Sequence, residues 1–136
     1  MSYQKSIELP KAFLHLKDEG FVLLTFKDNV VIEVEDAKEI DKTVIDELIY
    51  NQPFVVLIDA RDITSSLTHE ARDFFTNDEL ILKIRKAQAI VVNNLHTKLI
   101  ANFYMKFHKP INPVKVFSDY DKAENWLKKI RNKYYD

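Results

Sequence analysis

The sequence contains no cysteine and only one glycine among its 136 residues. The absence of cysteine excludes disulfides, thiolate metal sites, iron–sulfur clusters and cysteine nucleophiles. The single glycine, Gly20, cannot build a glycine-rich phosphate-binding loop, nor the nucleophile elbow of α/β-hydrolases. The composition therefore disfavours dinucleotide-binding enzymes, P-loop nucleotide hydrolases and serine esterases of that type.

Long apolar runs and an excess of one charge are also absent. No apolar run approaches the ~18 residues of a membrane span, and residues 1–5 lack the apolar core of a signal peptide. The formal net charge is −1, and Lys and Arg are intermixed with Asp and Glu, so no strong field would gather nucleic acid or an anionic membrane. We expect a cytoplasmic protein that binds no nucleic acid and has no membrane span.

The residues that are present describe a globular domain. Hydrophobic residues make up 46% and charged residues 30% of the chain, which is typical of a protein with one packed core. No linker, repeat or low-complexity tract interrupts the sequence. We expect a single domain over residues 1–136, with residues 1–11 and 132–136 frayed.

The segment from Phe54 to Phe75 indicates the fold class. Residues 54–58 are a continuous apolar run, which is typical of a parallel strand covered by helices on both faces. A polar turn then leads to a helix beginning near Thr68, whose hydroxyl can cap it. Partners and ligands of open α/β sheets are met where such strands end, so this turn is the best candidate site.

The rest of the chain alternates between predicted strands and helices. Residues 12–16 and 21–26 predict a β-hairpin closed by Gly20, and residues 30–34 predict a third, edge strand. Apolar residues at helical spacing predict a helix from about residue 35 to 50. Further strands are predicted over 87–92 and 114–117, and further helices over 78–85, 95–108 and from Ser118. The later strands should be parallel and joined by right-handed crossovers.

Three stretches carry a family resemblance: FVVLIDAR at residues 54–61, THEAR at 68–72 and PVKVFSD at 113–119. Together with the order of elements, they resemble bacterial SpoIIAA-like proteins of the STAS superfamily, and the likeness is nearest to a branch of short single-domain members. The resemblance covers nearly the whole chain. It implies an α/β, STAS-like mixed sheet with an N-terminal β-hairpin, parallel later strands and about four main helices.

The same resemblance bears on Thr68. Anti-sigma-factor antagonists of the superfamily carry an Asp-Ser-Ser/Thr-Gly turn whose serine is phosphorylated, and Thr68 falls near that place. Leu67, His69 and Glu70 replace the neighbouring residues of the motif, and Glu70 would repel a phosphate. We therefore favour a structural N-cap at Thr68 over a phosphoacceptor.

Eight residues are candidates for a partner or ligand site because they follow parallel strands or open the next helix. They are Asp59, Arg61, Ser65, Ser66, Thr68, His69, Asn93 and Asn94. Asp59 and Arg61 share one side of an extended chain and can form an ion pair. The serines and asparagines also fit plain turn and cap roles. The four histidines match no metal-ligand spacing, so we predict no metal and no cofactor.

Two functions remain open from the sequence. The first is a non-enzymatic STAS-like interaction or regulatory module that binds a protein partner, or a second copy of itself, through the helix starting near Thr68. The alternative is a carrier or sensor of a small apolar or anionic ligand, held at the strand ends or between aromatic helices that include Phe75 and Tyr104. We expect no enzymatic activity and no catalytic residues, because the sequence offers neither an activated nucleophile nor a paired acid and base.

Overall fold

A six-stranded mixed sheet forms the centre of the protein in the computed structural model, which describes residues 3–95, 97 and 111–135. The strands follow the order β1-β2-β3-β5-β7-β8. They are β1 (Lys5–Glu8), β2 (Ala12–Asp18), β3 (Phe21–Phe26), β5 (Phe54–Asp59), β7 (Arg85–Val91) and β8 (Val114–Phe117). β1, β2 and β3 are antiparallel neighbours, whereas β3, β5, β7 and β8 run parallel to one another. The predicted hairpin and the predicted parallel strands are both confirmed.

Gly20 closes the hairpin between β2 and β3. Its φ is 71°, in the left-handed region that favours glycine. A Cβ at this position would lie 2.8 Å from Cζ of Tyr135. The turn thus favours glycine, and any side chain at this position would also force the ring of Tyr135 to shift.

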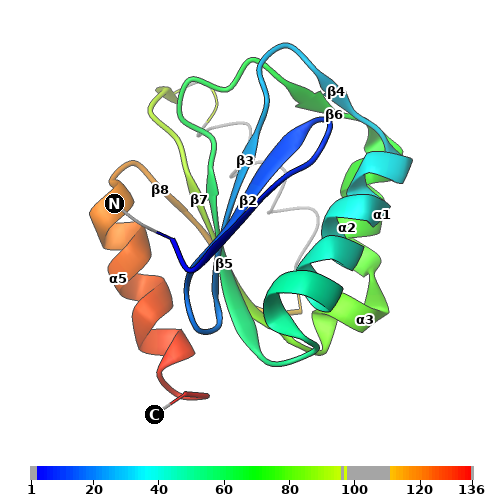
Figure 1. Cartoon of the computed structure of the whole chain (residues 1–136). Coiled ribbons are helices and arrows are strands. Elements are labelled where there is room, and N and C mark those ends of the chain that lie inside the picture. Colours follow the sequence, from blue (N-terminus) through cyan, green and yellow to red (C-terminus); the bar gives the residue numbers. More distant parts are fainter. Residues whose placement is uncertain (1–2, 96, 98–110, 136) are drawn as a thin grey trace.

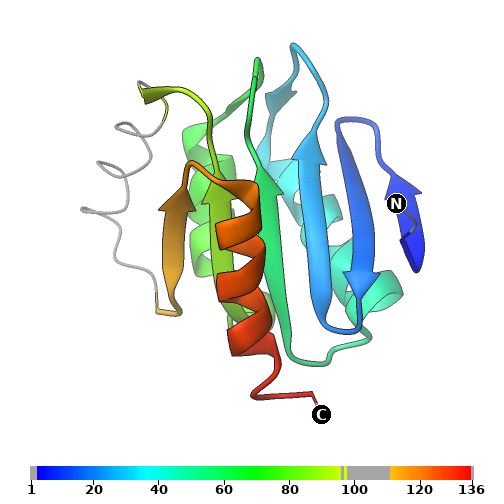
Figure 2. The same cartoon turned by 90° about the vertical axis from the view of Figure 1, so that its left-hand side faces the viewer.

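Helices cover both faces of the sheet (Figures 1 and 2). α5 (Tyr120–Arg131) packs on one face. The other face carries α1 (Val34–Thr43) with its π-helical continuation η1 (Val44–Ile49), together with α2 (His69–Asn77) and α3 (Glu79–Leu82). The continuous apolar character of β5 follows from this arrangement, because its alternate side chains enter two different cores.

The predicted α1 helix is confirmed, with one difference in its second half. Ala37, Ile40, Val44 and Leu48 are all buried, as their spacing predicts. From Val44 onward the helix widens to the π form and ends at Ile49, and Tyr50 and Asn51 then adopt left-handed backbone conformations. None of the described helices is long and apolar enough to cross a membrane.

The edge strand predicted over residues 30–34 is wrong in extent and place. Only β4 (Val31–Ile32) is extended, and it pairs in parallel with β6 (Ser66–Leu67) in a separate two-stranded sheet. A capping box ends it early: the Glu33 amide donates to the Asp36 carboxylate at 2.9 Å, so α1 begins at Val34. The alternating apolar residues of this segment therefore lead into a helix, and the strand does not continue past Ile32.

The expectation of frayed termini is also corrected for the described residues. β1 (Lys5–Glu8) pairs with β2 over its whole length. At the other end, the Tyr135 hydroxyl donates to the Pro53 carbonyl at 2.5 Å. The helix predicted over residues 95–108, with Tyr104, lies almost entirely outside the described residues.

Candidate functional site

The carboxyl end of β5 holds the predicted ion pair. Arg61 donates from Nε and Nη2 to the two carboxylate oxygens of Asp59, at 2.9 and 2.8 Å. Burial alone would raise the pKa of Asp59, but the hydrogen bonds from Arg61 outweigh it and hold that pKa below its ordinary value. The guanidinium also lies 5.0 Å from the ring centre of Tyr120 at the start of α5. Asp59 and Arg61 are therefore held by each other and by Tyr120 within the chain.

The two asparagines after β7 lie at the same edge and stabilise neighbouring turns. Asn93 accepts a hydrogen bond from the Asp62 amide at 3.1 Å and donates to its carboxylate at 2.8 Å. This double contact holds Asp62 in a left-handed conformation with φ 57°. Asn94 accepts from the amide of Thr97 at 3.2 Å. Their predicted turn and cap roles are those that the structure gives them.

Ser65, Ser66 and Thr68 lead the chain into α2. Ser65 donates to the Lys27 carbonyl and accepts from the Val30 amide at 3.3 Å. Ser66 belongs to β6. Thr68 is the N-cap residue of α2, and its hydroxyl accepts from the Ala71 amide at 3.1 Å.

His69 stands on the surface at the start of α2. Its Nε2 atom lies 3.2 Å from a carboxylate oxygen of Asp73, one helical turn later. Among the described residues, no cluster of three or more metal-binding side chains is found. The eight candidates thus form two groups: four around the ends of β5 and β7, and four along β6 and the start of α2.

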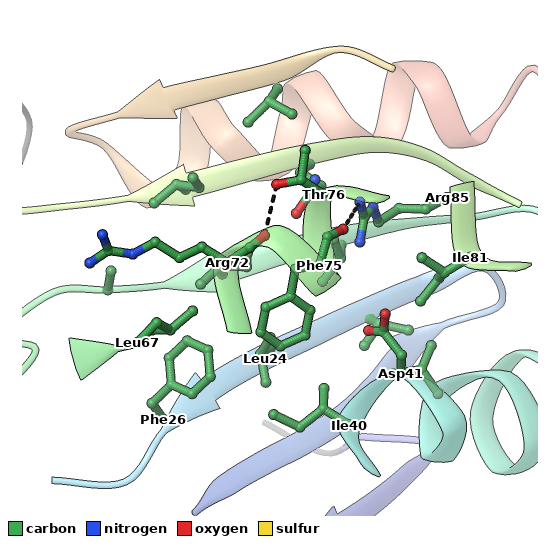
Figure 3. Close-up of a pocket in the computed structure, with 18 of the residues that line it drawn as sticks. Leu24, Phe26, Ile40, Asp41, Leu67, Arg72, Phe75, Thr76, Ile81 and Arg85 are labelled. Carbon is green, nitrogen blue, oxygen red and sulfur yellow. Dashed lines mark hydrogen bonds between the residues drawn. The ribbon is translucent and has the colours of Figure 1, made fainter. Parts of the chain in front are cut away.

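A cavity of about 520 Å³ lies beside the second group, between the main sheet and helices α1 to α3. We refer to it as the sheet–helix cavity, and Figure 3 shows part of its wall. Its apolar lining includes Leu24, Phe26, Ile40, Ile58, Phe75 and Ile81. Ser65, Ser66, Arg72, Thr76, Gln88 and Asn112 add polar atoms to the wall. Most of the wall is hydrocarbon, so an occupant would be mainly apolar.

Two buried ionisable residues in this wall were not singled out from the sequence. Asp41 of α1 and Arg85 of β7 are only 4% and 6% exposed. Burial lowers the pKa of the Arg85 guanidinium, whereas the negative charges of Asp41 and Asp78 raise it. The sequence did hold a signal for Asp41, since it falls four residues after Ala37 on the apolar side of the helix.

Comparisons with known proteins agree with this architecture. The crystal structure of an uncharacterised DUF3478-family protein from Shewanella loihica PV-4, which has a SpoIIAA-like fold, is similar to the chain. The TM-score is 0.58 at 18% sequence identity, and the similarity covers 90% of each chain. That likeness confirms the predicted SpoIIAA-like α/β fold. Comparison with curated proteins gives no match.

A family model extends the comparison to the sequence itself. The model described as "Domain of unknown function (DUF7793)" matches residues 14–131. This range runs from β2 to the last residue of α5 and contains the sheet–helix cavity. The chain therefore belongs to the DUF7793 family.

Proposed function

We propose that the protein is a non-enzymatic carrier or sensor that binds a small, mainly apolar ligand in the sheet–helix cavity. The observation that supports this proposal is the cavity itself. Its volume of about 520 Å³ falls in the range of about 300–1,000 Å³ that small-molecule sites occupy. Concave, mostly apolar spaces of this size with a few polar groups in the wall are typical of small-molecule sites.

The engagement of the polar candidates supports the same proposal. Asp59, Arg61, Ser65, Thr68 and Asn93 each have a hydrogen-bond partner within the chain. A ligand at the strand ends would have to compete with these contacts. A ligand in the cavity would instead gain from the burial of apolar surface.

A neutral fluorescent probe tests this proposal. N-phenyl-1-naphthylamine should bind the full chain saturably with a stoichiometry of one, and its emission should rise on entering the apolar site. Thr76→Trp places a large ring in the cavity wall and should weaken binding at least tenfold. Asn125→Trp, on the exposed side of α5 across the sheet, should leave the affinity unchanged.

Two outcomes would overturn the cavity as the binding site. One is the lack of saturable binding to the full chain. The other is equal affinity of the wild type and the Thr76→Trp variant, provided that both show the same cooperative unfolding. Native mass spectrometry of the protein purified from its own host then gives the mass of the natural occupant.

The second candidate function is regulation of a protein partner through the start of α2 and the turn before it. One observation favours it: α2 is shared between the cavity and the surface. Phe75 and Thr76 line the cavity, whereas His69 and Glu70 are exposed. A ligand that displaced α2 would thus alter the surface offered to a partner. Co-purification of the tagged protein from its native cells, with and without an occupant in the cavity, tests this function.

A further inference from the structure

The sheet–helix cavity contains a buried positive charge. Arg85 stands at the start of β7 and its side chain is almost inaccessible to solvent. Its Nη2 atom donates to the Phe75 carbonyl at 2.9 Å (Figure 3). Among the described residues, no carboxylate forms an ion pair with it, and this is its one side-chain hydrogen bond. A guanidinium carries five N–H donors, so the other donors of Arg85 have no hydrogen-bond partner among the described residues.

Asp41 brings an unsatisfied carboxyl oxygen into the same wall. Its Oδ2 atom is buried and has no hydrogen-bond partner among the residues that the structure describes. Three charged or titratable groups meet here: Asp41 from α1, Asp78 at the start of α3 and Arg85 from β7. Burial and the neighbouring Asp78 raise the pKa of Asp41 to about 8, so this carboxyl is mostly protonated near neutral pH and does not balance the charge of Arg85.

A buried cation without an ion pair is costly, because the apolar surroundings do not replace its lost hydration, and the nearby charge of Asp78 offsets this cost only in part. An anionic group placed between Arg85 and Asp41 would remove both deficits at once. A carboxylate would accept N–H donors from the guanidinium. It would also accept the O–H of the protonated Asp41 carboxyl, in place of the Asp78 carboxylate that hydrogen-bonds with Asp41 when the cavity is empty.

From these contacts we propose that the occupant of the sheet–helix cavity is an anionic amphiphile, an aliphatic monocarboxylate whose head binds Arg85 and Asp41. Its tail lies against the apolar wall, which includes Leu24, Phe26, Ile40 and Ile58. This inference rests on the proposed function, because it names the chemical class of the ligand for that cavity. Arg85 is then the residue that makes the cavity prefer a carboxylic acid over an uncharged ligand with a tail of the same length.

Decanoate and 1-decanol are matched probes for this assignment, since they share a tail and differ in the head group. Isothermal titration of the full chain at pH 7 should show at least tenfold tighter binding of decanoate. Arg85→Met keeps an unbranched apolar side chain but removes the charge. It should abolish the preference for decanoate, so that decanoate and 1-decanol bind the variant with affinities within about twofold of each other. Lys38→Met, which removes an exposed charge on α1, should keep the full preference.

A second measurement needs no variant at Arg85 and so remains decisive if Arg85→Met does not fold. The affinity of the wild type for decanoate should fall as the pH is raised from 7 to 9, because ionised Asp41 would repel the head group. The affinity for 1-decanol should stay constant over that range. Asp41→Asn should remove the pH dependence, since an amide stays neutral.

The outcomes separate the two proposals. If N-phenyl-1-naphthylamine and both decyl probes bind, but decanoate has no advantage, the acidic head is refuted and the carrier function stands. If the preference for decanoate survives in a folded Arg85→Met variant, the assignment of Arg85 is refuted. If none of the three probes binds, the proposed function fails together with this inference.

Discussion

Thr68 is the residue at which the two interpretations of the α2 start can be separated. Thr68→Ala removes the hydroxyl that accepts from the Ala71 amide, and loss of an N-cap should lower the free energy of unfolding by about 1 kcal/mol. Urea denaturation measures this difference. The matched control is Thr76→Ala, whose hydroxyl donates to a carbonyl inside the same helix. It should change stability by no more than about 0.5 kcal/mol.

The opposite pattern would favour a signalling role at this position. If Thr68→Ala left the free energy of unfolding unchanged and yet abolished binding of a partner, the cap would not be the main role of the residue. Phosphopeptide mapping adds a direct measurement of whether Thr68, Ser65 or Ser66 is modified. Ser65 would be the costliest of these to modify, because its hydroxyl joins the 27–30 turn to β6.

At the level of single residues, contacts between positions close in the sequence were easier to predict than the residues that line the cavity. The Asp59–Arg61 pair and the Thr68 cap depend on residues two or three positions apart, so spacing was enough to predict them. The position of Arg85 depends on an irregularity in the pairing of β7 with β5. This residue pairs with Phe54, but the register then shifts so that Ala87 pairs with Val55. This shift places Arg85 on the side of α1 and α3, whereas simple alternation would have placed it with Ala87 under α5.

At the scale of elements, Lys17 joins the end of the β2–β3 hairpin to α5. Its Nζ atom donates to the Glu124 carboxylate and to the Tyr120 hydroxyl, the latter at 2.8 Å. The two side chains of the ion pair are only 10% and 19% exposed. The hydrogen bond from Lys17 holds the pKa of Glu124 below its ordinary value. The pair therefore stabilises the docking of α5 on the sheet at neutral pH.

Glu124→Gln should lower the free energy of unfolding at pH 7 by about 1.5–3 kcal/mol, the usual worth of a hydrogen bond to a charged group. Glu35→Gln is the control, because its ion pair with Lys38 is long, at 3.7 Å, and exposed. That change should cost no more than about 0.5 kcal/mol. The Glu124 contribution is complete above the unfolded pKa of 4.5 and is lost as the pH falls through the lower folded value. Equal, small effects of both changes across this pH range would show that the Lys17–Glu124 pair does not stabilise the docking of α5.

For the whole molecule, the alternation of strands and helices was enough to predict the sheet. β3 and β5 are mainly apolar runs, β7 and β8 mix apolar and polar residues, and each crossover carries a helical pattern. β1 and β6 were missed because their few residues gain strand structure only from pairing with distant segments. The volume of the sheet–helix cavity was beyond prediction for a similar reason, since it depends on how side chains from several separate elements meet.

The buried carboxyl of Asp41 gives the stability of the whole molecule a specific pH dependence. Burial, reinforced by Asp78, raises its pKa from 3.8 to about 8. Between these values the folded state retains a proton that the unfolded state releases, so the free energy of unfolding falls as the pH rises. One such group contributes a slope of at most about 1.4 kcal/mol per pH unit. Below the unfolded pKa and above the folded one, it contributes no slope.

Asp41→Asn isolates this contribution, because the amide cannot ionise while all other titrating groups stay in place. Relative to the wild type, the free energy of unfolding of the variant should increase as the pH rises from 5 to about 8. Above that pH the difference between the two proteins should stay constant. Urea denaturation at intervals from pH 5 to 9 measures it, with Asp46→Asn on the exposed side of η1 as the control. A difference that stays constant over the whole range would mean that Asp41 is already ionised in the folded protein. In that case its charge would balance Arg85, and the cavity would have no need of an anionic ligand.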